Sequence, residues 1–139
     1  MIRTHGLTHV ALRVRDPRRS FDFYRDLLGA VAVYEDDDTI QAQTPGSRDV
    51  LVFERSPRQA GRAGGIVHFG FRLVAPVDIA QAKRELARLG AKIVDEGEFG
   101  PGQPFVFFLD PDGYEVELWY EPPTPVDPSD APKRGGRRA

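Results

Sequence analysis

Two of the three histidines in the chain and one glutamate near its end have the types and spacing that could support chemistry. His9 and His68 occupy equivalent points of a repeated stretch, because residues 6–14 match residues 65–73 with an offset of 68 − 9 = 59. Glu117 falls in an apolar stretch, where a buried carboxylate is unfavourable unless it is paired or bound to a cation. Two imidazoles and one carboxylate suit Fe(II), Mn(II), Zn(II), Co(II) or Ni(II) and leave coordination positions for water or substrate.

The alternation of side chains along a strand indicates how these residues could meet. In each repeat the apolar positions alternate with the position of the histidine, so His9 and His68 share the polar face of their strands. If the two halves pair about a pseudo-twofold axis, both imidazoles and Glu117 enter one concavity. The alternative is structural: His9 and His68 form a hydrogen-bonded pair, and Glu117 pairs with Arg13 or Arg72.

The elements that must position these residues follow the same order in both halves. Each repeated strand precedes a helical pattern, with Asp16 as a cap, Pro17 in the first turn and Gly29 as the stop, then with Asp78 as a cap and Gly90 as the stop. Strands are expected at residues 30–34, 39–43 and 49–54, and again at 92–95, 104–109 and 114–120. The sequence therefore predicts an α+β protein of two βαβββ modules.

Domain organisation follows from the same pattern. We expect one domain over residues 1–121, with modules at 6–54 and 65–121 joined by the loop 55–64. Residues 95–103 are rich in glycine and indicate a second loop. Residues 110–113, Asp-Pro-Asp-Gly, predict a tight hairpin turn. The tail 122–139 contains five prolines and few large apolar residues, and we expect it to be disordered.

Composition excludes several classes of function. The 139 residues include 19 Lys+Arg and 21 Asp+Glu, and the formal net charge of −2 provides no positive field for nucleic acid or an anionic membrane. The chain has no Cys, which excludes disulfides and thiolate metal sites. No apolar run approaches the roughly 20 residues of a spanning helix. We expect a cytoplasmic homodimer that binds a small-molecule substrate.

Four segments carry a family resemblance: residues 6–10, 20–29, 67–69 and 108–117. Together they resemble the vicinal oxygen chelate superfamily, which includes glyoxalase I, extradiol dioxygenases, fosfomycin-modifying thiol transferases, methylmalonyl-CoA epimerase and bleomycin-resistance proteins. The resemblance implies a curled mixed sheet around a metal-binding cleft. It also implies that His9, His68 and Glu117 are the metal ligands, and that adjacent oxygens of a substrate bind the ion.

The departures from the subfamily patterns suggest a reaction class. In the internal alignment Leu51 falls opposite Glu117, so the fourth acidic ligand of glyoxalase I and the epimerase is missing. Phe107 occupies the place of an extradiol tyrosine, and Ala11 that of a threonine in the fosfomycin enzymes. We expect a dioxygenase-like enzyme with three protein ligands. A glyoxalase-type lyase or isomerase, a thiol transferase and a non-catalytic ligand-sequestering protein remain alternatives.

Four further residues are candidates for binding the substrate. Phe53, Phe107 and Trp119 could supply apolar walls and Gln41 a hydrogen bond, which suits a small aromatic or amphipathic oxygenated molecule. The alternative is that the aromatic side chains belong to the core and that Gln41 faces water.

Overall fold

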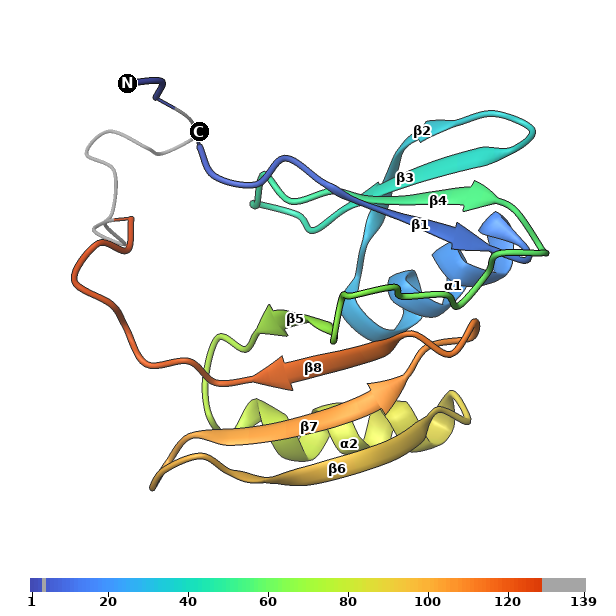
Figure 1. Cartoon of the computed structure of the whole chain (residues 1–139). Coiled ribbons are helices and arrows are strands. Elements are labelled where there is room, and N and C mark those ends of the chain that lie inside the picture. Colours follow the sequence, from blue (N-terminus) through green and yellow to red (C-terminus); the bar gives the residue numbers. More distant parts are fainter. Residues whose placement is uncertain (4, 129–139) are drawn as a thin grey trace, which may run out of the picture.

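The computed structural model describes residues 1–3 and 5–128 and has the predicted α+β architecture of two βαβββ modules (Figure 1). The first module contains β1 (Val10–Val14), α1 (Pro17–Leu28), β2 (Val31–Glu35), β3 (Thr39–Gln43) and β4 (Leu51–Arg55). The second contains β5 (Phe69–Arg72), α2 (Asp78–Arg88), β6 (Lys92–Glu98), β7 (Pro104–Leu109) and β8 (Glu115–Trp119).

The helix boundaries show which local signals decide them. The side chain of Asp16 accepts a hydrogen bond from Arg18 N at 3.0 Å, and Gly29 ends α1 in the left-handed conformation with φ 74°, as predicted. The second cap differs from the prediction. Val77 precedes α2 without a side-chain cap, and the carboxylate of Asp78 in the first turn accepts a hydrogen bond from Ala75 N at 3.1 Å.

Each module forms its own mixed sheet of four strands, in the orders β1-β4-β3-β2 and β5-β8-β7-β6. β1 pairs with β4 and β5 with β8 in parallel, and the remaining pairs are antiparallel. β6 continues to Glu98, so the predicted loop 95–103 begins as strand. β1 and β5 are both edge strands, and within the described residues no strand pairing joins the two sheets.

Over the described residues, buried apolar side chains of both sheets and both helices form one hydrophobic core. The ring of Tyr24 on α1 stacks on the ring of Phe53 of β4, with centroids 5.4 Å apart. It also contacts the ring of Phe71 of β5, with centroids 6.2 Å apart. Phe23 contacts Phe108 of β7 at 6.1 Å. Because side chains alternate along each strand, the faces opposite this core are the outer faces of the molecule.

The turn between β7 and β8 connects the modules through buried hydrogen bonds. Asp110 accepts hydrogen bonds from Tyr24 Oη at 2.8 Å, Asp112 N at 2.9 Å and Tyr114 N at 3.0 Å. Gly113, at φ 93°, donates its N–H to Asp110 O, which confirms the predicted turn. Burial, reinforced by the neighbouring Asp110, raises the pKa of Tyr24 well above its ordinary value.

Asp112 makes a second set of contacts with the start of α1. Its carboxylate accepts hydrogen bonds from Arg15 N and from the side chains of Arg15, Arg19 and Ser20, at 3.0 to 3.2 Å. These bonds link residues more than 90 positions apart. The two modules of one chain are therefore held together through the turn.

The beginning of the predicted tail lies against the end of β5. Arg72 donates hydrogen bonds to Pro122 O at 3.0 Å and to the carboxylate of Asp127 at 2.9 Å and 3.1 Å. The rest of the predicted tail, 129–139, lies outside the described residues. Among the residues that are described, no helix has the length and apolar character needed to cross a membrane.

Candidate metal centre

His68 and Glu117 lie together on the outer face of the second sheet. The parallel register of β5 and β8 pairs Gly70 with Glu117 and so brings His68, just before β5, close to the same strand. His68 Nε2 lies 3.6 Å from Glu117 Oε1, and His68 Nδ1 lies 3.9 Å from Glu115 Oε2. The imidazole is therefore flanked by two carboxylates, one on each side.

Gly70 permits the close approach of β5 to Glu117. A Cβ atom at this position would lie 2.9 Å from Glu117 O and 3.2 Å from Glu117 Cβ. A side chain at Gly70 would thus push against the residue that carries the carboxylate, and glycine is the residue that avoids this.

The environment of Glu117 fits a cation ligand. The residue is only 9% exposed, and its burial raises the pKa of the carboxyl group, while the nearby His68 opposes that shift. The separation of 3.6 Å between His68 Nε2 and Glu117 Oε1 is longer than a good hydrogen bond. It accommodates one ion between them, because metal–nitrogen and metal–oxygen bonds are each about 2.0–2.2 Å long.

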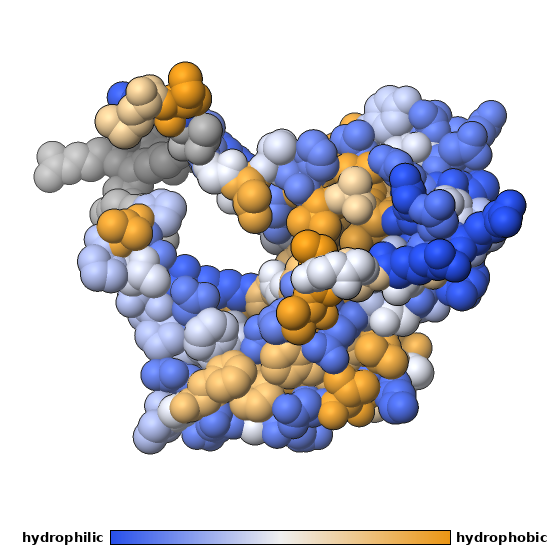
Figure 2. Space-filling view, in the orientation of Figure 1, coloured by the Kyte–Doolittle hydropathy of each residue, from blue (hydrophilic) through white to orange (hydrophobic). Residues whose placement is uncertain are grey.

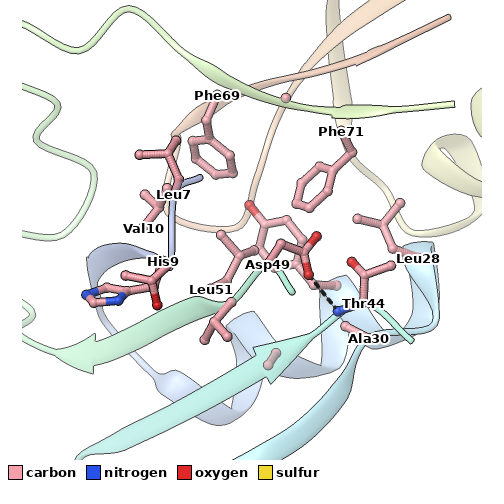
Figure 3. Close-up of a pocket in the computed structure, with 15 residues that line it drawn as sticks. Leu7, His9, Val10, Leu28, Ala30, Thr44, Asp49, Leu51, Phe69 and Phe71 are labelled. Atoms are coloured by element: carbon pink, nitrogen blue, oxygen red, sulfur yellow. Dashed lines mark hydrogen bonds between the residues drawn. The ribbon is translucent and has the colours of Figure 1, made fainter. Parts of the chain in front are cut away.

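His9 lies apart from this pair. It is exposed just before β1 and lines one end of a cavity of about 170 Å³ between the modules. Figure 3 shows its ring directed away from the apolar residues of that cavity, which include Phe69 and Phe71. Over residues 1–3 and 5–128 no three His, Asp or Glu side chains are close enough together to hold a metal ion. The expected meeting of His9 with His68 and Glu117 does not occur within one chain, because the shared core turns the two polar faces outward.

The strand register corrects the predicted position of the missing fourth ligand. Val10 pairs with Leu51 in the first module, and its counterpart Phe69 pairs with Val116 in the second. Leu51 is therefore equivalent to Val116, and both belong to the core. The internal alignment of the sequence was displaced by one residue, which exchanges the two faces of a strand.

Val52 is the residue that corresponds to Glu117. It pairs with Ala11 on β1, as Glu117 pairs with Gly70 on β5, and it is absent from the core cluster that contains Leu51. An aliphatic side chain cannot coordinate a metal. The predicted absence of a fourth ligand thus holds for Val52 rather than for Leu51.

The four predicted substrate-binding residues lie in different environments. Phe53 is fully buried in the core, where its ring stacks on Tyr24, so the structural alternative describes it. Gln41 is half-buried and pairs with Val52 on the outer side of the first module. Phe107 contacts the ring of His68 at 4.9 Å. Trp119 lies on β8, two residues beyond Glu117 and on the same face.

Some residues of this region were not assigned a role from the sequence. Glu115 flanks His68 and could orient its ring through its charge, since the Glu115 carboxylate lies 3.9 Å from His68 Nδ1, beyond hydrogen-bond distance. Its place two positions before Glu117 is the signal for this role. Phe99 and Phe105 contact each other and Trp119 or Phe107 on the same face. Phe99 lies in the predicted loop, where no periodicity indicated its direction.

The model of the Glyoxalase/Bleomycin resistance protein/Dioxygenase superfamily matches residues 6–118. The chain belongs to this superfamily. It is 28% identical over 123 residues to the manganese-dependent 2,3-dihydroxybiphenyl 1,2-dioxygenase of Geobacillus genomosp. 3, a match that covers 86% of this chain and 38% of that relative. The chain thus spans well under half the length of this curated relative.

Solved structures of other proteins share the fold. Lactoylglutathione lyase from Agrobacterium tumefaciens is 21% identical with a TM-score of 0.67, and the match covers 84% of this chain and 94% of that one. A mutant of the fosfomycin resistance protein FosX from Listeria monocytogenes, complexed with Mn(II) and 1S,2S-dihydroxypropylphosphonic acid, is 17% identical with a TM-score of 0.71. That match covers 84% of this chain and 90% of the FosX chain. At these identities the likeness shows the fold alone.

Proposed function

We propose that this superfamily member is a divalent-metal-dependent enzyme, dioxygenase-like in its reaction, that acts on a small oxygenated molecule. The observation that carries the proposal is the buried carboxylate of Glu117 facing His68 Nε2 across 3.6 Å. Manganese in the names of a dioxygenase relative and of a FosX structure supports the choice of cation. When bound, the ion supplies Lewis acidity toward substrate oxygens.

In this proposal, each residue around the pair of His68 and Glu117 has a defined task. His68 and Glu117 hold the ion, Glu115 orients the imidazole of His68, and Gly70 lets β5 approach β8 closely enough for this geometry. Val52 contributes no fourth ligand. With three protein ligands, the ion keeps coordination positions that water or substrate can occupy. Such positions are what a bidentate substrate together with dioxygen requires.

The third ligand in this proposal is the partner's copy of His9 in a homodimer. β1 and β5 are both unpaired on one side within the described residues, and unpaired strand edges readily accept another strand. Exposed apolar side chains lie beside the two histidines: Leu7 is 87% exposed, Ile66 67% and Val67 78%.

A twofold dimer that places β1 of one copy along β5 of the other covers these apolar residues. It also joins the two outer faces, one from each copy, into a single surface. That surface contains His9 from one copy and His68 with Glu117 from the other. Two equivalent centres result, each completed by both chains.

The basic test is metal content and oxygen chemistry. Protein expressed with manganese, iron, zinc and nickel available should contain about one ion per chain by elemental analysis. His68→Ala and Glu117→Gln should each lose that ion while the protein stays folded. The loaded protein is then screened for oxygen consumption with small diols and hydroxy acids. Stoichiometric metal in either variant contradicts the proposed site, and metal binding without turnover favours ligand sequestration.

A mixed dimer tests the shared centre directly. His9→Ala and Glu117→Gln homodimers should each bind no metal at wild-type affinity. Co-expression of the two chains should restore about a quarter of the sites, since about half of the dimers are mixed and each of those has one intact centre. A centre formed within one chain gives no recovery, because neither chain then has all three ligands.

A further inference from the structure

Four aromatic rings cover the outer face of the second sheet beside His68 and Glu117. Phe99 stacks on Phe105 with ring centroids 4.1 Å apart and meets Trp119 edge-on at 5.3 Å. Phe105 contacts Phe107 at 5.5 Å. In Figure 1 α2 lies behind β6–β8, and Figure 2 shows hydrophobic residues on the near side of these strands. We call the side chains of Phe99, Phe105, Phe107 and Trp119 the aromatic wall.

The first module shows that the fold itself does not require this wall. The register pairs Phe107 with Glu117 and Phe105 with Trp119 in the second module. The corresponding pairs in the first module are Gln41 with Val52 and Thr39 with Glu54. The same module therefore forms with polar residues at three of the four wall positions.

The wall is also separate from the core. Phe105 is only 8% exposed, yet it is absent from the cluster of core residues, so its neighbours on the outer face are what bury it. Phe99 is 57% exposed, although phenylalanine side chains are usually buried. Trp119 Nε1 is buried and has no hydrogen-bond partner among the described residues.

The wall is continuous with the candidate metal centre. The ring of Phe107 meets the ring of His68 edge-on, with centroids 4.9 Å apart. A molecule held through its oxygens at His68 and Glu117 would therefore have its remaining atoms beside these rings. Flat apolar groups gain from edge-to-face and offset contacts with aromatic side chains beyond the burial of their area.

We infer that the aromatic wall is the recognition surface for an aryl group of the substrate. This inference rests on the proposed function and narrows its substrate class to molecules in which adjacent oxygens lie next to an aromatic ring. Phe99 and Phe107 determine specificity by contacting that ring. The buried N–H of Trp119, which has no partner among the described residues, leaves one hydrogen-bond donor of the wall unused.

Three hydroxamates with the same pair of chelating oxygens test the inference on the manganese-loaded protein. Acetohydroxamate has a methyl group, benzohydroxamate a phenyl ring and cyclohexanecarbohydroxamate a puckered ring of similar size. Calorimetry measures all three, and quenching of Trp119, the single tryptophan of the chain, reports contact with the wall. Benzohydroxamate should bind at least about tenfold more tightly than acetohydroxamate and more tightly than the cyclohexyl compound.

The wall variants separate specificity from chelation. Phe107→Gln, which copies Gln41 of the first module, and Phe99→Ala at an exposed site should each lower the ratio of benzohydroxamate affinity to acetohydroxamate affinity several-fold. Val77→Ala, at a residue 77% exposed beside α2, is the control and should alter neither. Equal affinity for the methyl and phenyl compounds, or unchanged phenyl affinity in both wall variants, overturns the inference while the metal centre stands.

A metal-free arm keeps the two proposals distinguishable. If the protein binds no manganese, the proposed function fails, and benzohydroxamate is then titrated against the metal-free protein. Saturable quenching of Trp119 that Phe107→Gln weakens supports the wall by itself. Quenching that does not saturate overturns the wall as well.

Discussion

The buried hydroxyl of Tyr24 connects the two modules and can be removed with almost no change in shape. It donates a hydrogen bond of 2.8 Å to the carboxylate of Asp110, while the ring of Tyr24 packs between Phe53 and Phe71. Tyr24→Phe keeps the ring and these packing contacts. The substitution therefore isolates one hydrogen bond between α1 and the turn before β8.

The expected loss of stability follows from what remains. Asp110 is 5% exposed and keeps its bonds from Asp112 N and Tyr114 N, but the oxygen that faced Tyr24 loses its donor. Removing a buried hydrogen bond to a charged group lowers the free energy of unfolding by about 1.5–3 kcal/mol. For a chain of this length that corresponds to a fall in Tm of about 5–10 °C.

The pKa of Tyr24 adds a pH dependence of known sign. Because the pKa is raised well above the ordinary 10.0, the folded protein keeps the phenolic proton where the unfolded chain loses it. Stability from this hydroxyl is complete below pH 10 and declines as the pH rises above it. The stability difference between wild type and Tyr24→Phe should therefore narrow in alkaline solution.

Urea unfolding at pH 7 and above pH 10 measures both effects, with Tyr34→Phe as the matched control. Tyr34 also donates to an aspartate, Asp36, at 2.7 Å, but the residue is 49% exposed, so removing its hydroxyl should change the free energy of unfolding much less. Equal effects of the two substitutions would refute the reasoning. So would a difference for Tyr24→Phe that is constant or widens above pH 10.

Three other substitutions and one truncation have defined outcomes. Val52→Glu, at a residue only 7% exposed, should lower Tm less than Leu51→Glu, because the Leu51 side chain belongs to the core cluster and that of Val52 does not. Val52→Glu should also add a ligand, seen as a changed coordination signature of bound Mn(II). Gly70→Ala should lower the free energy of unfolding by about 1–3 kcal/mol in urea. It should also weaken metal binding, because the added Cβ displaces Glu117. Unchanged metal affinity would contradict the close contact between Gly70 and Glu117. Truncation after Glu121 should lower Tm only slightly by calorimetry, since the ion pair it removes is partly exposed. A large loss would show that the tail packs more extensively.

The architecture was predictable because its determinants are local or repeated. Asp16 and Gly29 define the two ends of α1 through contacts within a few residues. The Asp-Pro-Asp-Gly turn forms from the backbone preferences of its own residues. The repeat that contains His9 and His68 indicates two copies of one module. Alternation along β8 placed Glu117 on the polar face without knowledge of its partners.

Tertiary structure decided everything that depends on which surfaces meet. Periodicity assigns a residue to a face but does not count residues across a loop, so the internal alignment placed Leu51 where the register places Val52. Duplication made His9 and His68 equivalent, yet the common core between the sheets directs their faces apart. The partnership of Tyr24 with Asp110 spans 86 residues, and no local pattern reports such a contact. The sequence by itself determined the two modules and their polar faces, whereas the packing of both modules on one core determined that a single chain brings together only two of the three predicted ligands.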